Sequence, residues 1–307
     1  MKTIYKLFLF VLLSLSVSYT YAQTDTTKKG GTDTISTPKA HFRIGVSYIN
    51  NSVYLGRTDT VTTAGISPII SYTFQSGIYL AGGLDFLPNR KINKLDGGNL
   101  EIGYDHHFTD DFEGGVAFTK LFYNSTSTQV SSSLSSVITA YADYDIASII
   151  TPGVVFGYNI AKSGGINDVL LNPNISHDFE IKGIFGDSDF LLISPQFGFN
   201  AGSQNYYAEY IEKKNHISKK AAAAANAAYN SYYDALSNFT LLDYEITAPL
   251  VYKSGHFRFS FTPTYAFAHD SLPQSTPAQI AITKDIQISS PYKPSVFYFS
   301  LGVSLKF

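Results

Sequence analysis

The last fourteen residues of the chain, 294–307, read PSVFYFSLGVSLKF. From Phe297 to Phe307 every odd position is apolar, and most of the even positions between them are small or polar. Successive side chains of a strand point to opposite faces, so this stretch predicts a strand with one apolar and one polar face. A soluble sheet rarely ends on an unprotected aromatic edge, because such an edge invites aggregation. The pattern therefore favours a closed barrel, which has no edge.

This terminal strand resembles the C-terminal signature of bacterial outer-membrane β-barrel proteins, a final Phe preceded by hydrophobic residues at every second position. The positions that carry the resemblance are Phe299, Leu301, Val303, Leu305 and Phe307. The resemblance implies that the strand is an insertion signal read by the barrel-insertion machinery. It also implies that the apolar face contacts outer-membrane lipid and that the protein lies in the cell outer membrane of a Gram-negative bacterium. It is a match of architecture, so it implies no catalytic or ligand-binding residues.

The N-terminal residues predict export. Lys2 and Lys6 precede an apolar run over residues 7–17, which is shorter than the roughly 20 residues of a spanning helix. We therefore expect residues 1–22 to be a signal peptide and residues 23–40, rich in Thr, Asp, Lys and Gly, to be a disordered periplasmic leader. The chain has no Cys, which excludes a lipid-anchored lipoprotein and thiolate metal sites. A net charge of −2 gives no reason to expect nucleic acid as a partner.

Residues 41–307 predict an all-β fold, a single transmembrane antiparallel up-and-down β-barrel of about twelve strands. One miscounted hairpin would make it ten or fourteen. The long connections, residues 52–63, 125–136, 202–238 and 269–293, all follow odd strands, and those after even strands are short. In outer-membrane barrels the long loops are extracellular. Prolines inside several predicted strands argue against the fold, since proline removes a ladder donor, and we expect them at strand ends or bulges.

One loop breaks the strand pattern. Within residues 202–238, tyrosines recur at helical spacing near 206–211 and a run of Ala follows at 221–228. Both features predict one or two helices in a long extracellular loop. Such an insert would plug the pore if folded inward; the interpretation we favour is a plain exposed helix.

Charged residues at inward positions are the candidates for function. Acids outnumber bases there, which predicts a lumen that attracts cations. The lumen-lining candidates are Arg43, Asp85, Glu101, Asp143, Asp243, Glu245 and Arg258. The same side chains could instead form salt bridges across a filled barrel. We thus expect a passive, weakly cation-favouring pore for small solutes or ions. The alternative is a closed barrel that acts as a structural or surface-binding scaffold, for adhesion or ligand recognition, through its extracellular loops.

Enzymatic and metal functions have little support. A barrel phospholipase needs a nucleophile, a base and an orienting residue that converge, whereas His269, Asp270 and Ser271 are consecutive residues of a loop. The pair His106 and His107 lies near several Asp residues, but a solvated turn explains them as well. The sequence predicts no enzyme, with a phospholipase-type hydrolase as the alternative, and no cofactor or metal. It does not predict the oligomeric state.

Overall fold

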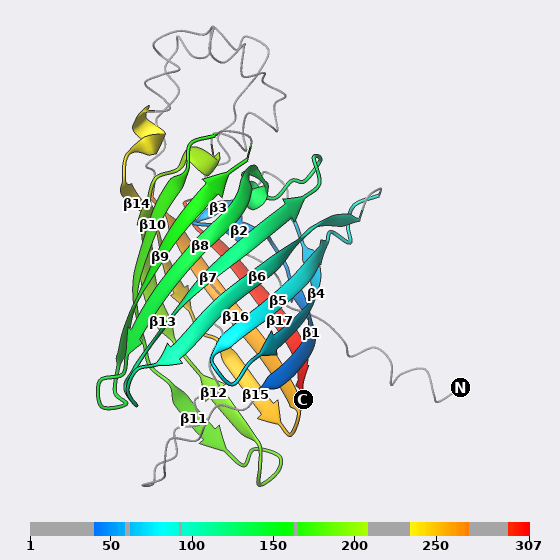
Figure 1. The fold of residues 1–307 in the computed structure, drawn as a ribbon, viewed down its shortest axis with the longest axis vertical. Helices are drawn as coiled ribbons and strands as arrows, with labels where there is room; N and C mark the ends of the chain where they lie inside the picture. Colours follow the sequence, from blue (N-terminus) through cyan, green and yellow to red (C-terminus); the bar gives the residue numbers. More distant parts are fainter. Residues whose placement is uncertain (1–39, 59–61, 92–93, 163–164, 208–233, 270–293) are drawn as a thin grey trace, which may run out of the picture.

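The strands of the computed structural model form one barrel (Figure 1). The structure describes residues 40–58, 62–91, 94–162, 165–207, 234–269 and 294–307. The expected signal peptide and nearly all of the expected leader lie outside these residues. The elements are β1 (His41–Ile49), β2 (Val53–Tyr54), β3 (Arg57–Thr58), β4 (Gly65–Thr73), β5 (Ile78–Phe86), β6 (Leu95–His107), β7 (Phe112–Tyr123), η1 (Val130–Ser133), β8 (Leu134–Tyr144), β9 (Thr151–Ala161), β10 (Asp168–Ser176), β11 (Phe179–Lys182), β12 (Phe190–Ile193), β13 (Gln196–Gly202), β14 (Thr240–Thr247), β15 (Leu250–Ser254), β16 (Phe257–Ala268) and β17 (Val296–Lys306).

The sheet closes on itself through its first and last strands. β17 pairs antiparallel with β1, from Arg43 opposite Lys306 to Ile49 opposite Ser300, and it also pairs along its length with β16. Fifteen segments form this sheet, and three of the wall strands consist of two segments each, so the wall has twelve strands. Neighbours in the wall are antiparallel and follow chain order. The predicted twelve-stranded up-and-down β-barrel is confirmed.

Three adjacent wall strands are each broken into two segments. β10 and β11 separate at residues 177–178, β12 and β13 at residues 194–195, and β14 and β15 at residues 248–249. Pro195 and Pro249 lie at two of these breaks, as expected for residues without an amide donor. Pro68, Pro173 and Pro263 instead lie inside β4, β10 and β16, where they pair with Val46, Val154 and Phe299, so the expectation is wrong for these three. The hairpin of β11 and β12 projects beyond the rest of the wall (Figure 1).

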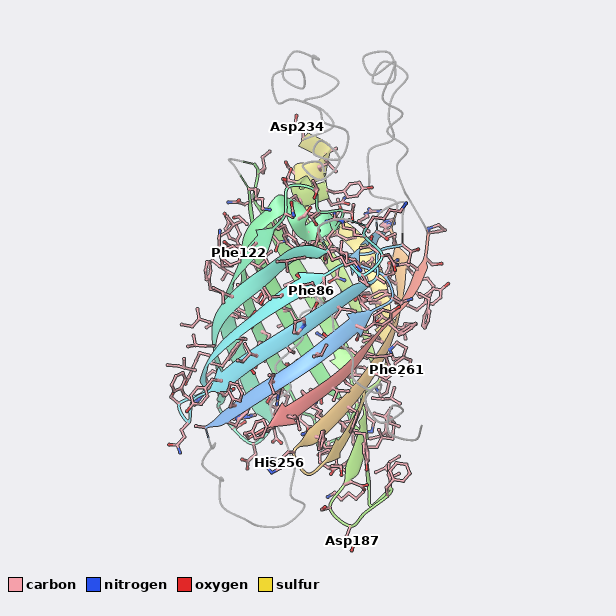
Figure 2. The ribbon with its side chains drawn as sticks, turned by 90° about the vertical axis from the view of Figure 1, so that its right-hand side faces the viewer. Phe86, Phe122, Asp187, Asp234, His256 and Phe261 are labelled. Atoms are coloured by element: carbon pink, nitrogen blue, oxygen red, sulfur yellow. The ribbon has the colours of Figure 1, made fainter. Side chains whose placement is uncertain are left out.

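The two ends of the barrel differ. Short turns such as residues 74–77, 108–111 and 255–256 connect strands at the end where β1 begins and the chain ends. The long connections lie at the opposite end, as predicted. Figure 2 shows both ends, with His256 in a short turn and Asp187 at the tip of the projecting hairpin. Two short helical stretches, 205–207 and 234–237, flank the longest connection. The Ala-rich run expected to be helical lies outside the described residues.

The outer face of the wall is apolar. Large hydrophobic side chains are exposed at alternate positions, for example Leu100 at 60% and Phe122 at 49%. Figure 2 shows such side chains projecting outward from the wall. This much exposed apolar surface is unfavourable in water. It is stable only in contact with another apolar phase. Among the described residues, no helix is long and apolar enough to cross a membrane.

Candidate functional site

The inner wall changes from buried to solvent-accessible along the barrel axis. On β16, Thr264, Ala266 and Ala268 near the long loops are buried, whereas Arg258, Ser260 and Thr262 near the short turns are half-buried. β8 and β10 show the same gradient, with Val137 and Leu170 buried and Asp143 and Asn174 half-buried. Solvent therefore reaches the lumen from the short-turn end but is excluded at the mouth, the end that carries the long loops.

A hairpin from the first long connection fills the mouth. β2 and β3 pair through Val53 with Thr58 and Tyr54 with Arg57. Leu55 and Gly56 make the turn, with φ values of 50° and 69°. Two positive φ values are typical of a type I′ hairpin turn, which Gly adopts freely but Leu adopts at a cost of about 1–2 kcal/mol. We call residues 53–58 the mouth hairpin.

Apolar side chains of the mouth hairpin pack against several strands of the wall. The buried cluster consists of Tyr54, Leu55, Leu121, Val130, Leu134, Val137, Leu170, Tyr206, Tyr207 and Leu242. Its members come from the hairpin, from η1, from β7, β8, β10 and β14, and from the helical stretch 205–207. The Tyr54 ring lies edge-on to Tyr206, with 5.0 Å between ring centroids. Because the contacts reach strands around the barrel, the hairpin lies within the mouth.

Arg57 is the polar anchor of the mouth hairpin. Its Nη2 donates hydrogen bonds to Gln204 Oε1 at 3.0 Å and to the carbonyl oxygen of His269 at 3.1 Å. Its guanidinium carbon lies 5.9 Å from the centre of the Tyr207 ring. Arg57 thus ties the hairpin to the bases of the two longest connections.

Asp168 holds the start of the longest connection in place. Its carboxylate accepts hydrogen bonds from Ser203 Oγ at 2.6 Å, from the Asn205 amide at 2.8 Å and from the Tyr206 amide at 2.7 Å. These bonds fix Tyr206 where its ring supports Tyr54. The Tyr54 hydroxyl in turn accepts a hydrogen bond from Asn159 Nδ2 on β9, and Asn159 is the strand partner of Asp168.

A ladder of amide side chains lines the inner wall between the mouth and the wider lumen. Gln196 Nε2 donates to Asn174 Oδ1 at 2.8 Å, and Asn174 Nδ2 donates to Asn172 Oδ1 at 3.2 Å. Asn172 Nδ2 donates to Asn200 Oδ1 at 3.0 Å, and Asn200 Nδ2 donates to Asp243 Oδ1 at 2.6 Å. The ladder ends directly below Gly56 of the mouth hairpin.

The candidate lumen residues separate into two groups by depth. Asp85 and Asp243 are buried near the mouth, and Asp85 accepts a hydrogen bond from Ser67 Oγ at 2.7 Å. Glu245 lies just below Asp243 and accepts a hydrogen bond from the Tyr298 hydroxyl at 3.2 Å. Farther down are the half-buried side chains of Arg43, Glu101, Asp143 and Arg258. Glu101 accepts a hydrogen bond of 2.6 Å from Thr119 Oγ1, so some of these charges are held against the wall.

The sequence does not predict the mouth hairpin. Its turn is Leu55-Gly56, whereas the strong signals for a tight hairpin are Asn-Gly and Asp-Gly. Residues 52–63 therefore predict only a long loop. The one available signal was the apolar run Val53, Tyr54 and Leu55 in a mostly polar connection.

The described residues give no support to the metal site or to the hydrolase considered from the sequence. Among the described residues, no three metal-ligating side chains are grouped closely enough to hold an ion. His107 Nδ1 is instead 3.1 Å from Glu113 Oε2. Of the three loop residues considered for a hydrolase, only His269 is among the described residues.

Comparison with family models and with curated proteins gives no match. Among solved structures, the chain is similar to the KdgM porin, with 10% identity, 86% of this chain and 99% of that chain covered, and a TM-score of 0.47. It is similar to the NanC porin, with 10% identity, coverage of 87% and 100%, and a TM-score of 0.42. It is also similar to LpxR from Salmonella typhimurium, with 9% identity, coverage of 86% and 99%, and a TM-score of 0.39. At these values the likeness carries no conclusion about the function of this chain.

Proposed function

We propose that the protein is a gated outer-membrane channel for small polar solutes, which the mouth hairpin closes from within. The observation that carries the proposal is the contrast along one inner wall, buried at Ala266 and half-buried at Arg258. A barrel filled throughout would bury its inward side chains at both ends. The exposed apolar outer face supports a place in lipid, and the terminal strand supports recognition by the barrel-insertion machinery.

The balance of forces on the mouth hairpin supports a movable gate. Apolar packing and the hydrogen bonds of Arg57 favour closure. Two features oppose it: Leu55 has a positive φ, and Asp243 Oδ2 is buried with no hydrogen-bond donor among the described residues. Leaving a buried polar atom unsatisfied costs about 1–3 kcal/mol. Because these costs disappear when the hairpin leaves the mouth, the closed state is less stable than its contact list suggests.

Opening would also set the charge preference. Asp85, Asp243 and Glu245 belong to the wall, whereas Arg57 belongs to the hairpin and would leave with it. The opened mouth would then carry an excess of carboxylates, which attracts cations and repels anions. The weak cation preference is thus a property of the open state in this proposal.

The test is conductance of the refolded protein in a planar bilayer, compared with two variants. One replaces residues 53–58 by a Gly-Ser linker of equal length, and the other is Arg57→Ala. Hydrogen bonds of a charged group are worth about 1.5–3 kcal/mol, so Arg57→Ala should raise the open population about tenfold to a hundredfold. Lys182→Ala, which removes an exposed charge from the projecting hairpin, should conduct like the wild type.

Discrete current steps that become frequent in the linker variant would support the gated channel. The linker variant is first shown to be folded by its boiling-dependent gel shift. If it then gives no current in the bilayer, the channel proposal is wrong. The closed-scaffold alternative would then hold, and the search for a ligand would move to the outer loops.

A further inference from the structure

Four cationic side chains gather on one inner wall at the short-turn end. They are Arg43 on β1, Lys253 on β15, Arg258 on β16 and Lys306 on β17. Lys253 pairs with Arg258, and Arg43 pairs with Lys306. Arg258 pairs with Ser304, which shares the inward face of β17 with Lys306. The four charges therefore lie side by side on adjacent strands, and we call them the cationic wall.

Three carboxylates gather on another inner wall at the same end. They are Asp105 on β6, Glu113 on β7 and Asp143 on β8, and Glu113 lies directly opposite Asp143 in the strand register. Asp105 accepts a hydrogen bond of 2.9 Å from the Tyr141 hydroxyl. We call these residues the acidic wall.

The two walls face each other across the lumen. The cationic wall lies on four consecutive wall strands, and the acidic wall lies on three strands centred about half a circuit away in the twelve-stranded order. Arg43, Arg258 and Lys306 lie within three residues of their strand ends at the short-turn rim, as do Glu113, Asp143 and Asp105. The walls are thus at the same depth, and both are half-buried, within reach of solvent.

The distance between the walls selects a length of ligand. Twelve strands spaced by about 4.8 Å and tilted by about 40° enclose a circle about 24 Å across between backbones. Charged side chains extend into this space from both walls. A ligand that contacts both walls must therefore hold its two charges farther apart than the single Cα that separates the ammonium and carboxylate groups of one amino acid. An extended peptide rises about 3.3–3.6 Å per residue, so three residues span the gap and one amino acid does not.

We propose that this rim binds short zwitterionic peptides, with the carboxylate on the cationic wall and the ammonium group on the acidic wall. The amide ladder flanks the same space, and Gln196, Asn174 and Asn172 supply donors and acceptors of the kind that peptide groups need. A simple anion would meet the acidic wall and a simple cation the cationic wall. A ligand with both charges at the correct separation satisfies both walls at once. Such a peptide would be the solute of the channel proposed above, and this inference rests on that proposal.

The binding test does not require an open mouth, because solvent reaches the rim in the closed state. Trialanine would be titrated into wild-type protein in detergent micelles by calorimetry, against alanine, N-acetyl-trialanine and trialanine amide. Removal of either terminal charge should weaken binding about tenfold, and alanine should bind more weakly than trialanine.

Two substitutions test the orientation. Arg258→Gln should weaken trialanine binding and leave trialanine amide unaffected, because the amide lacks the carboxylate that Arg258 would contact. Asp143→Asn should weaken trialanine binding and leave N-acetyl-trialanine unaffected. Each variant would first be checked for the boiling-dependent gel shift of a folded barrel.

Equal binding of trialanine and its capped forms would overturn the inference, as would alanine binding as tightly as trialanine or a swapped pattern of sensitivity in the two variants. These results would leave the channel proposal standing if the linker variant conducts. Conversely, peptide binding by a protein whose linker variant is silent would overturn the channel alone.

Discussion

Gly56 of the mouth hairpin lies against Asp243 of β14 so closely that a Cβ on Gly56 would be 2.9 Å from both the Cβ and Oδ2 of Asp243. Gly56 also has a φ of 69°. The contact joins the first long connection to the tenth wall strand. It lies at the upper end of the amide ladder, where the lumen is sealed.

Gly56→Ala should therefore push the mouth hairpin out of the mouth. The added methyl group meets the Asp243 side chain, and a residue with a Cβ at this φ costs about 1–2 kcal/mol. We expect a higher open probability in planar bilayers with an unchanged single-channel conductance. Gly186→Ala is the matched control, because nothing lies within 4 Å of its added Cβ. A current no greater than that of the control would mean that the hairpin is not the gate.

The carboxylates near the mouth should set ion preference once the hairpin is removed. In the linker variant we expect a cation-side reversal potential in a KCl gradient. Glu245→Gln and Asp85→Asn should each shift this potential toward zero, because each removes a negative charge from the inner wall. Asp187→Asn, at the tip of the projecting hairpin, should leave it unchanged (Figure 2). An anion-side potential in the linker variant would contradict the preference.

The turn of the projecting hairpin should open in acid. The Tyr252 hydroxyl donates a hydrogen bond of 2.5 Å to Asp189 Oδ2, and the amides of Ile184 and Phe185 also donate to this carboxylate. The Tyr252 bond, and then these amide bonds, lower the pKa of Asp189 below its usual range. A lowered folded-state pKa stabilises the turn above the unfolded pKa of about 3.9, and the stabilisation is lost as pH falls through the folded value.

We therefore expect the Ile184 and Phe185 amides to lose protection from hydrogen exchange only below about pH 4. Tyr252→Phe removes the main cause of the lowered pKa, so protection should be lost at a higher pH in that variant. The same onset in wild type and variant would show that the Tyr252 hydroxyl does not control the turn.

Deletion of Phe307 should impair assembly in the cell more than folding in detergent. Its amide and carbonyl pair with Phe42 at 2.8 and 3.0 Å, but the residue is 63% exposed, so the barrel loses little packing. We expect less protein in the outer-membrane fraction and a normal boiling-dependent gel shift after refolding. Phe297→Ala changes an exposed aromatic residue at the other end of the same strand and should assemble normally. Equal assembly of both variants would argue against the insertion signal.

The sequence predicted the wall well because wall residues obey local rules. Alternation places Leu100 and Phe122 outside and Asp143 and Arg258 inside without any knowledge of strand partners. The breaks of three adjacent strands were harder to predict. Pro195 and Pro249 interrupt hydrogen bonding in a way that depends on which neighbour each strand faces, and the sequence does not state the register.

The sequence by itself determined the barrel, a number of strands close to twelve and the end that carries the long loops, because the period of two and the turn residues act over a few neighbouring positions. Only the tertiary structure decided that residues 53–58 enter the mouth and that two walls of opposite charge face each other at the rim. Both features join residues far apart in the chain, such as Gly56 with Asp243 and Arg43 with Arg258. They depend on barrel closure and on the balance between apolar packing and the cost of burying charge, and no local pattern encodes either.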